Sequence, residues 1–299
     1  MNFLQTEIPR IDSIKNPYQS FDVTVDVLRL DLVHPIVSGN KWFKLKKYLQ
    51  DATKKNKKTI ITFGGAFSNH IIATATACKE VGFTSIGIIR GEEPKLFSDT
   101  LKDAQTAGMH LFFCSREDYK SKIIPQKVWQ QFAQKDIYII NEGGYGEKGK
   151  EGAENILDNR TTAFTHIITA IGTGTTIAGI VSAAKPGQKI IGISVLKNHS
   201  RLNEEINTLV PPRLHNQYTI YHDYHFGGYA KYNTELINFM NKWYKETSIP
   251  SDFVYTGKLF YAVNDLIHKE IFSYGSKILV IHSGGLQGNR SLPKGTLMY

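Results

Sequence analysis

His166-Ile167-Ile168-Thr169-Ala170-Ile171 runs directly into Gly172-Thr173-Gly174-Thr175-Thr176, and this passage decides the fold class. Its first half is apolar and β-branched without polar alternation, as in a strand that is buried on both faces. The glycines then permit a tight turn, after which Ile177-Ala178-Gly179 continues a helical pattern. A buried strand, a turn and a helix in this order indicate an α/β protein with parallel strands.

Five other apolar segments have the same form, so strands and helices alternate along most of the chain. The expected strands are 59–63, 85–90, 136–140, 189–195 and 277–282, and the expected helices lie near 40–55, 67–81, 98–107, 124–134, 174–185, 200–209, 232–246 and 257–271. Ligands of such sheets bind beyond the carboxyl ends of strands, where helices begin. We therefore expect the site among the polar loops at these ends, which are 64–70, 141–146, 172–176 and 282–288.

The composition of the 299 residues, 41% of them hydrophobic, suits one large α/β domain or two modest ones. No run approaches the roughly 18 apolar residues that span a membrane, and residues 1–7 lack the basic and apolar regions of a secretory signal. Cys78 and Cys114 could form at most one disulfide and have no metal-ligand spacing. We expect a cytoplasmic protein without membrane or metal binding.

The net charge of +9 raises the question of a nucleic-acid partner. The lysines are dispersed, however, and no recognition motif accompanies them. Their densest run, 54–58, falls where a helix is expected to end, a place that the helix dipole favours for cations. We therefore exclude nucleic-acid binding, while a basic surface can still attract anionic metabolites.

Lys41 follows the flexible lead-in Ser38-Gly39-Asn40 where a helix is expected to begin. The turn 172–176 lacks the lysine of a P-loop and the glycine spacing of a dinucleotide fingerprint, and its N–H groups and hydroxyls suit one phosphate monoester. An amine that can form a Schiff base, together with a phosphate cradle, is what pyridoxal 5′-phosphate (PLP) requires. The alternatives are a solvated first-turn lysine and an ordinary tight turn.

Gly64-Gly65-Ala66-Phe67-Ser68-Asn69-His70 places polar side chains and free N–H groups at a second helix start, which suits a carboxylate. Simple helix capping is the alternative, and His70 could be a base or an orienting residue. Further glycine-rich, aromatic turns lie at 141–146, 225–229 and 254–258. Their tyrosines can flank a planar ring, move protons or merely pack.

The motifs at 38–41, 64–70, 172–176, 254–258 and 282–285 occur in the order found in the 1-aminocyclopropane-1-carboxylate (ACC) deaminase/D-cysteine desulfhydrase family, which the chain resembles. The resemblance spans nearly the whole chain. It implies the PLP-dependent, tryptophan-synthase-β-like α/β fold (fold type II), with two open domains of mostly parallel sheets, and a homodimer. The larger domain would comprise 1–45 and 140–299, and the smaller inserted domain 46–139.

The resemblance also assigns roles to individual residues. It makes Lys41 the lysine that holds PLP and exchanges the α-proton, and Asn69 the partner of the PLP 3′-oxygen close to the substrate. Ser68 and His70 are expected to contact the substrate carboxylate, with Ser68 as a second proton carrier. The expected phosphate contacts are Gly172, Thr173, Gly174, Thr175 and Thr176, and the expected catalytic tyrosines on the substrate side are Tyr229 and Tyr255.

Two departures from the ACC deaminases indicate the reaction, since Thr256 and Ser283 stand where those enzymes have Glu and Leu. A neutral hydroxyl leaves the pyridine nitrogen of PLP mostly uncharged, and the weaker electron sink suits β-elimination of a good leaving group. We therefore predict a D-cysteine desulfhydrase-like lyase that releases pyruvate, ammonia and sulfide. The alternatives are ACC deaminase, a non-catalytic small-molecule binding protein and a nucleotide-dependent enzyme. Ile71 and Ile72, where many relatives are polar, alter the helix beside the site.

Overall fold

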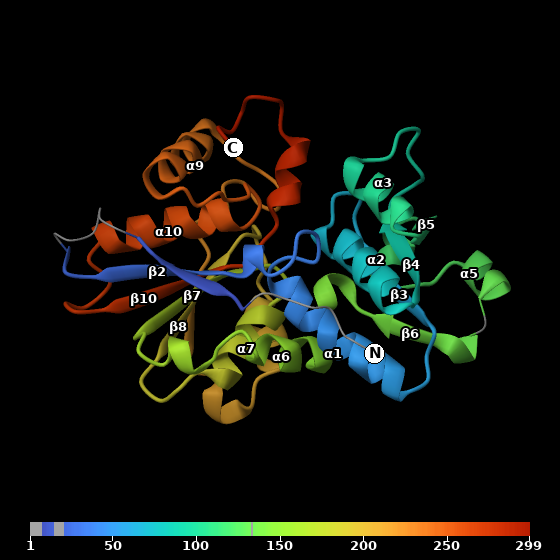
Figure 1. The fold of residues 1–299 in the computed structure, drawn as a ribbon, viewed down its shortest axis with the longest axis horizontal. Helices are drawn as coiled ribbons and strands as arrows, with labels where there is room; N and C mark the ends of the chain where they lie inside the picture. Colours follow the sequence, from blue (N-terminus) through green and yellow to red (C-terminus); the bar gives the residue numbers. More distant parts are fainter. Residues whose placement is uncertain (1–7, 15–20, 133) are drawn as a thin grey trace.

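The structure, a computed structural model, describes residues 8–14, 21–132 and 134–299 and contains two sheets (Figure 1). The larger has the order β1-β2-β10-β7-β8-β9 and is parallel except for β1, with β1 (Arg10–Ser13), β2 (Thr24–Arg29), β7 (His166–Ile171), β8 (Lys189–Ser194), β9 (Tyr218–Tyr221) and β10 (Lys277–His282). The smaller is parallel throughout in the order β5-β4-β3-β6, with β3 (Thr59–Gly64), β4 (Thr84–Arg90), β5 (His110–Cys114) and β6 (Ile137–Ile140). The predicted fold class is confirmed.

The helices connect these strands and cover both sheets. They are α1 (Asn40–Lys54), α2 (Asn69–Val81), α3 (Asp99–Thr106), α4 (Arg116–Lys120), α5 (Gln126–Gln131), α6 (Glu147–Glu154), α7 (Thr175–Ala183), α8 (Leu202–Asn207), α9 (Thr234–Thr247) and α10 (Thr256–His268). Each predicted strand and helix is present, with ends shifted by a few residues. The predicted domain boundaries stay a prediction, and the expectation for residues 1–7 falls outside the described residues.

The sequence patterns missed several elements for local reasons. In β2 the apolar run is interrupted by Asp26, and α6 contains two glycines that lower its helical propensity. Both glycines are needed for packing, because a Cβ on Gly149 would lie 2.1 Å from the Gly144 carbonyl oxygen and one on Gly152 would lie 2.3 Å from the Phe43 oxygen. Close contacts of α6 with α1 and with the turn at Gly144 therefore override local preference here.

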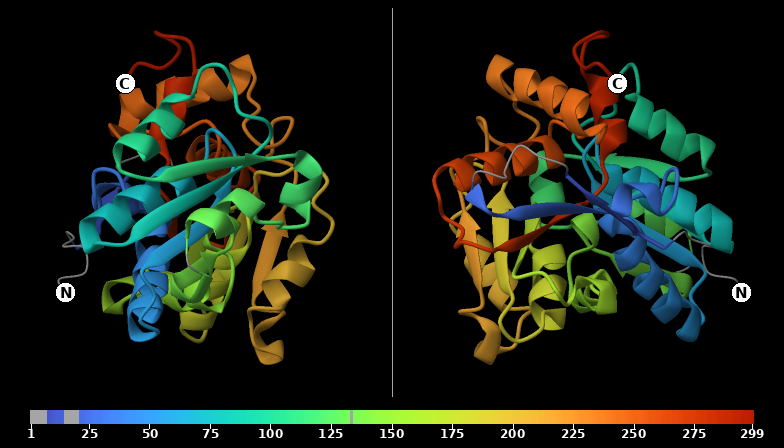
Figure 2. Two further views of the ribbon diagram at one scale, coloured as in Figure 1. Left: turned by 90° about the vertical axis from the view of Figure 1, so that its right-hand side faces the viewer. Right: turned by 60° about the vertical axis from the view of Figure 1, so that its left-hand side comes forward.

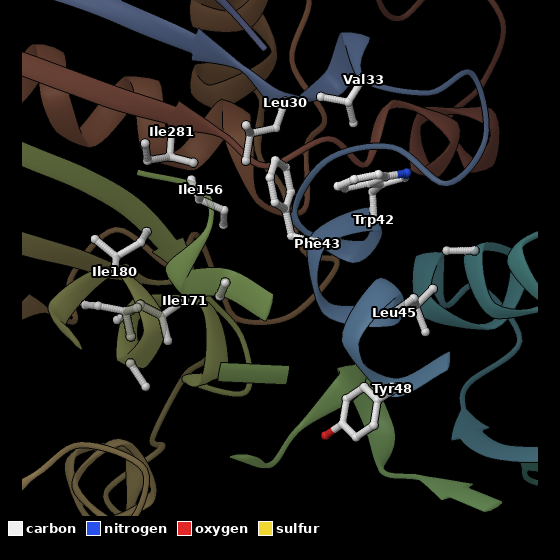
Figure 3. Close-up of a cluster of buried hydrophobic side chains, with 14 of the residues drawn as sticks. Leu30, Val33, Trp42, Phe43, Leu45, Tyr48, Ile156, Ile171, Ile180 and Ile281 are labelled. Atoms are coloured by element: carbon white, nitrogen blue, oxygen red, sulfur yellow. The ribbon is translucent and has the colours of Figure 1, made fainter. Parts of the chain in front are cut away.

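Helix α1 joins the two sheets through one hydrophobic core (Figure 3). Its Trp42, Phe43 and Leu45 belong to the cluster that also contains Leu30 and Ile281 from the larger sheet's side. In the close-up Phe43 points toward Leu30, while Leu45 points toward α2. The same cluster reaches the smaller sheet at Ile60 and Ile140. The start of α1 is thereby held at the junction of the sheets.

The opposite face of the larger sheet is covered by α10 and α9, above the sheet in Figure 1. Figure 2 shows the C-terminal segment, in red, beside α3 of the smaller sheet's side. No helix among the described residues is both long and apolar enough to cross a lipid bilayer.

Candidate active site

A cavity of about 670 Å³ lies where the carboxyl ends of the strands of both sheets face each other. The sequence-predicted site residues that line it are Lys41, Ser68, Asn69, His70, Gly172, Thr173, Gly174, Thr176, Tyr229, Tyr255 and Ser283. Thr175 and Thr256 lie behind its wall and are fully buried. The structure therefore brings the separate loop motifs around one space, although their assigned roles remain predictions.

The lead-in to Lys41 packs directly on the turn after β10. Gly39 has a positive φ of 69°, and a Cβ there would lie 1.8 Å from the carbonyl oxygen of Ser283. The same oxygen accepts the N–H of Asn40 at 3.3 Å. Only glycine permits both this conformation and this approach. The contact fixes where α1 begins and which way its first side chains point.

Asn40 links the lysine to the glycine–threonine turn. Its Oδ1 accepts a hydrogen bond from Nζ of Lys41 at 3.0 Å, and its Nδ2 donates to Oγ1 of Thr176 at 2.8 Å. One buried amide therefore sets the position of the amine relative to the start of α7. The expected Schiff-base lysine and the expected phosphate turn are neighbours in space although they lie far apart in sequence.

Two lysines of α1 share the cavity wall. Burial lowers the pKa of Lys41 to about 8, although the carboxylate of Asp252 opposes this shift. Burial, and then the charge of Lys41, lower the pKa of Lys44 well below its usual value. Nζ of Lys44 donates to the carbonyl oxygen of Gly143 at 2.8 Å. The sequence analysis missed Lys44, which the three-residue spacing from Lys41 could have placed on the same helix face.

The turn before α7 has the form of an anion site. Gly174 is the N-cap with a φ of 78°, and no side chain among the described residues caps the helix. The first N–H groups of α7 are therefore available to a ligand, and the helix dipole favours negative charge there. A Cβ on Gly174 would lie 2.7 Å from Cγ1 of Ile206, so the turn is also closely packed from behind.

The start of α2 supplies a second set of polar groups. Oγ of Ser68 accepts the N–H of His70 at 3.3 Å and so caps the helix, while its own proton remains available as a donor. Oδ1 of Asn69 is buried without a hydrogen-bond partner among the described residues. An unpaired amide oxygen at a cavity wall is costly unless a ligand satisfies it. Ser68 and Asn69 thus suit contacts to a polar ligand.

His70 is held by the smaller sheet. Its Nε2 lies 2.8 Å from Oγ1 of Thr62, and that hydroxyl donates to the carbonyl oxygen of Ile140 at 2.9 Å. A proton on Nε2 satisfies both contacts, which leaves Nδ1 as an acceptor. Burial, and then the charges of Lys41 and Lys44, lower the pKa of His70 well below its usual value. A neutral imidazole in this tautomer can orient the start of α2, and the predicted contact of His70 with the substrate carboxylate stays a prediction.

Tyr229 and Tyr255 form an edge-to-face pair on the larger sheet's side, with ring centroids 6.0 Å apart. Burial, and then Tyr229, raise the pKa of Tyr255 well above its usual value. Burial also raises the pKa of Tyr229. Both phenols therefore stay protonated at physiological pH and can donate hydrogen bonds.

Comparison with known proteins agrees with this geometry. Residues 25–284 match the family model described as "Pyridoxal-phosphate dependent enzyme". A protein of Pyrococcus horikoshii named "Putative 1-aminocyclopropane-1-carboxylate deaminase" is 28% identical over 95% of this chain and 94% of its own length. The Arabidopsis thaliana protein named "Bifunctional D-cysteine desulfhydrase/1-aminocyclopropane-1-carboxylate deaminase, mitochondrial" is 31% identical over 88% of this chain and 72% of its own.

Solved structures show the same relationship. The crystal structure of an ACC deaminase homologue superposes with a TM-score of 0.80 at 28% identity, covering 96% of this chain and 94% of that one. An O-ureido-L-serine synthase shares the fold, with a TM-score of 0.69 at 13% identity over 96% and 94% of the two chains. The architecture is thus that of the fold type II PLP-dependent enzymes. Within that class, this chain belongs to the ACC deaminase/D-cysteine desulfhydrase family.

The residues present fit the cofactor that this family implies. The uncapped start of α7 suits its phosphate, Lys41 suits its aldehyde, and the unpaired amide oxygen of Asn69 marks a place for a polar ligand atom. The predicted leaning toward D-cysteine desulfhydrase is not supported as such, because the relatives' names favour ACC deaminase.

Proposed function

We propose that this PLP-dependent enzyme is a lyase that removes the α-proton and a β-substituent from a small, D-cysteine-like amino acid. The products are pyruvate, ammonia and the leaving group, which is sulfide for cysteine. The observation that carries the proposal is the amide of Asn40, which bonds both Nζ of Lys41 and Oγ1 of Thr176. It sets an amine and an anion-binding turn at a fixed separation on one cavity wall.

Each group of residues at the cavity has a proposed role that follows from its chemistry. The turn 172–176 holds a phosphate, and Ser68 with the N–H groups of α2 holds the substrate carboxylate. PLP, when bound, draws electron density from the substrate α-carbon. Lys41 then takes the α-proton, and its lowered pKa of about 8 leaves about a tenth of the amine neutral at pH 7. Tyr229 and Tyr255 act as neutral donors on the substrate side.

The side chain at position 256 supports elimination over ring opening. Thr256 cannot hold a proton on the pyridine nitrogen as a glutamate can, so departure of a good leaving group has to assist the loss of the α-proton. The second candidate is ACC deaminase, which the names of the relatives favour over the desulfhydrase. We further expect a homodimer, as the family resemblance implies, which light scattering on the purified protein would check.

A panel of D- and L-amino acids together with ACC, assayed for keto acid and ammonia, tests the proposal. Pyruvate from D-cysteine or 3-chloro-D-alanine, with little 2-oxobutyrate from ACC, supports the lyase. The reverse preference identifies an ACC deaminase. Purified protein that is colourless, takes up no PLP and gives no borohydride-stable adduct would instead indicate a binding protein of another kind.

A further inference from the structure

Arg90 places an unpaired positive charge at the cavity. It is the last residue of β4, so it lies at the ligand-binding edge of the smaller sheet. Its side chain lines the cavity and is exposed. A Cβ built on Gly65 would lie 3.9 Å from Nη2 of Arg90, which places the guanidinium beside the loop that leads to Ser68.

The other ionisable side chains around the cavity have partners. Two ion-pair contacts show this. Nζ of Lys122 lies 3.0 Å from Oε2 of Glu142, and Nε2 of His199 lies 3.2 Å from Oε2 of Glu205.

The guanidinium of Arg90 lies 5.9 Å from the ring centroid of Tyr119 but has neither a hydrogen bond nor an ion pair to any described residue. By contrast, other arginines such as Arg29, Arg160 and Arg290 pair with carboxylates. The guanidinium of Arg90 is therefore free to bind an anion inside the cavity.

Arg90 lies close to the proposed carboxylate site, because its guanidinium is beside the loop that leads to Ser68. Because the start of α2 is proposed to hold the α-carboxylate, a second acidic group on the substrate side chain is what would remain for Arg90 to bind. The charge of Arg90 acts on Tyr229, whose pKa it lowers against the larger effect of burial. Arg90 and Tyr229 both line the cavity, Arg90 from the end of β4 and Tyr229 from the loop after β9.

We propose that the preferred substrate carries a second acidic group, at the end of its side chain, which Arg90 binds. The group is a sulfonate or a phosphate, and a guanidinium binds either through paired hydrogen bonds. This inference rests on the proposed lyase function and specifies its substrate class. An uncharged side chain such as that of 3-chloroalanine then makes a poorer substrate than an acidic one of similar size.

The elimination balances with an acidic leaving group. Lys41 accepts the α-proton, the bond from Cβ to the leaving group breaks, and the electron pair stays on the leaving group. A sulfonate departs as sulfite and a phosphate ester as phosphate, while water hydrolyses the released 2-aminoacrylate to pyruvate and ammonia. The leaving group gains negative charge as the bond breaks, so a nearby guanidinium stabilises the transition state.

The test compares ligands that differ only in charge. Aspartate and asparagine, in both enantiomers, are titrated into the PLP-loaded enzyme and followed by the absorbance of the bound cofactor. Cysteate, O-phosphoserine and 3-chloroalanine are compared as substrates. Each measurement is repeated with Arg90→Met, with Arg90→Lys, and with Arg213→Met, which removes an exposed arginine that does not line the cavity.

We expect aspartate to bind at least about ten-fold more tightly than asparagine, and Arg90→Met to remove about 10- to 100-fold of this preference and of kcat/KM for the acidic substrates. Arg90→Lys should retain part of the preference, and Arg213→Met should change nothing. Equal binding of aspartate and asparagine, or an unchanged preference in Arg90→Met, overturns the inference even where elimination from 3-chloroalanine upholds the lyase. Failure to bind PLP would count against the proposed function itself.

Discussion

Oγ1 of Thr256 lies 2.7 Å from Oδ1 of Asp252 and donates its only proton to that carboxylate. The same hydroxyl accepts the N–H of Asp252 at 2.7 Å, and the carboxylate also accepts the N–H groups of Val254, Tyr255 and Thr256. Both side chains are fully buried. The hydroxyl of Thr256 therefore has no proton left to donate and keeps one uncharged lone pair.

The residue at position 256 is predicted to decide between β-elimination and the opening of ACC. Thr256→Glu together with Ser283→Leu should lower elimination from D-cysteine or 3-chloro-D-alanine and raise the opening of ACC, because the new carboxylate can hold a proton on the pyridine nitrogen. Thr256→Glu should also lower the free energy of unfolding by about 1.5–3 kcal/mol, since it removes a hydrogen bond to the buried Asp252 and adds a like charge beside it. Rates on both substrates and urea denaturation measure these effects.

Thr256→Ser is the matched control, because it keeps the hydroxyl that Asp252 binds. It should retain the wild-type substrate preference and most of the stability. Robust opening of ACC by the wild-type protein would refute the electronic argument while leaving the fold and cofactor assignments intact.

The rate at which the apoprotein takes up PLP should rise with pH and reach half its maximum near pH 8. The reason is that only the neutral amine of Lys41 attacks an aldehyde, and burial lowers the pKa of this lysine to about 8, so protonation below that pH slows the reaction. Stopped-flow absorbance measures the profile. Lys41→Ala should fold normally but lose covalent PLP and activity, whereas Lys47→Ala, which does not line the cavity, should lose neither. Reduction with borohydride that marks another lysine would contradict the assignment.

Replacement of Gly174 should weaken PLP binding more than it disturbs the fold. A Cβ there would lie 2.7 Å from Cγ1 of Ile206 at a residue with a φ of 78°, so either the Ile206 side chain or the start of α7 must shift. We expect about a 10- to 100-fold loss of PLP affinity in Gly174→Ala, measured by equilibrium titration. Gly187→Ala is the control, since Gly187 has a φ of 88° but no atom within 4 Å of the added Cβ. Equal losses of PLP affinity in Gly174→Ala and Gly187→Ala would show that the phosphate does not bind at this turn.

Tyr255→Phe should lower kcat by about 10²-fold without removing a limb from the pH–rate profile. The raised pKa of Tyr255 keeps its phenol protonated up to well above pH 10, so the tyrosine acts as a donor and not as a titrating base. Tyr274→Phe, at a strongly exposed position, should have no effect. A profile that lost a basic limb only in Tyr255→Phe would show that the phenol does titrate.

The sequence was sufficient for those parts of the fold whose signal is local. The unbroken apolar run of β7 and the glycines after it predicted a buried strand, a turn and a helix, and all three are present. The residues after β3, β7 and β10 could be assigned to one site because parallel strands bring their carboxyl ends together. The contact of Gly39 with Ser283 has no local signal, since its only trace is a glycine whose partner lies at the other end of the chain.

The residues that the sequence missed act through tertiary contacts. Asp252 resembles an ordinary capping residue, and only the structure shows that its carboxylate is buried against Thr256. Arg90 resembles the polar end of a strand, and its importance depends on a cavity formed with residues from the other sheet. Lys44 alone left a trace in the sequence, in its spacing from Lys41.

Arg290, in the segment that follows β10 of the larger sheet, forms an exposed ion pair with Asp103 on α3, which belongs to the smaller sheet's side. Its Nη1 lies 2.5 Å from Oδ2 of Asp103 on α3, while its own segment follows Gly285 at the cavity wall. An exposed ion pair stabilises by about 0.2–1 kcal/mol, so Arg290→Ala should change the Tm little. It should raise KM by up to about five-fold, because loss of the ion pair favours separation of the larger and smaller sheets around the cavity. The effect should shrink as salt screens the wild-type pair. Arg160→Ala breaks the pair with Asp158, away from the cavity, and should leave KM unchanged. Equal KM values for the two variants would show that the Arg290 pair has no influence on substrate binding.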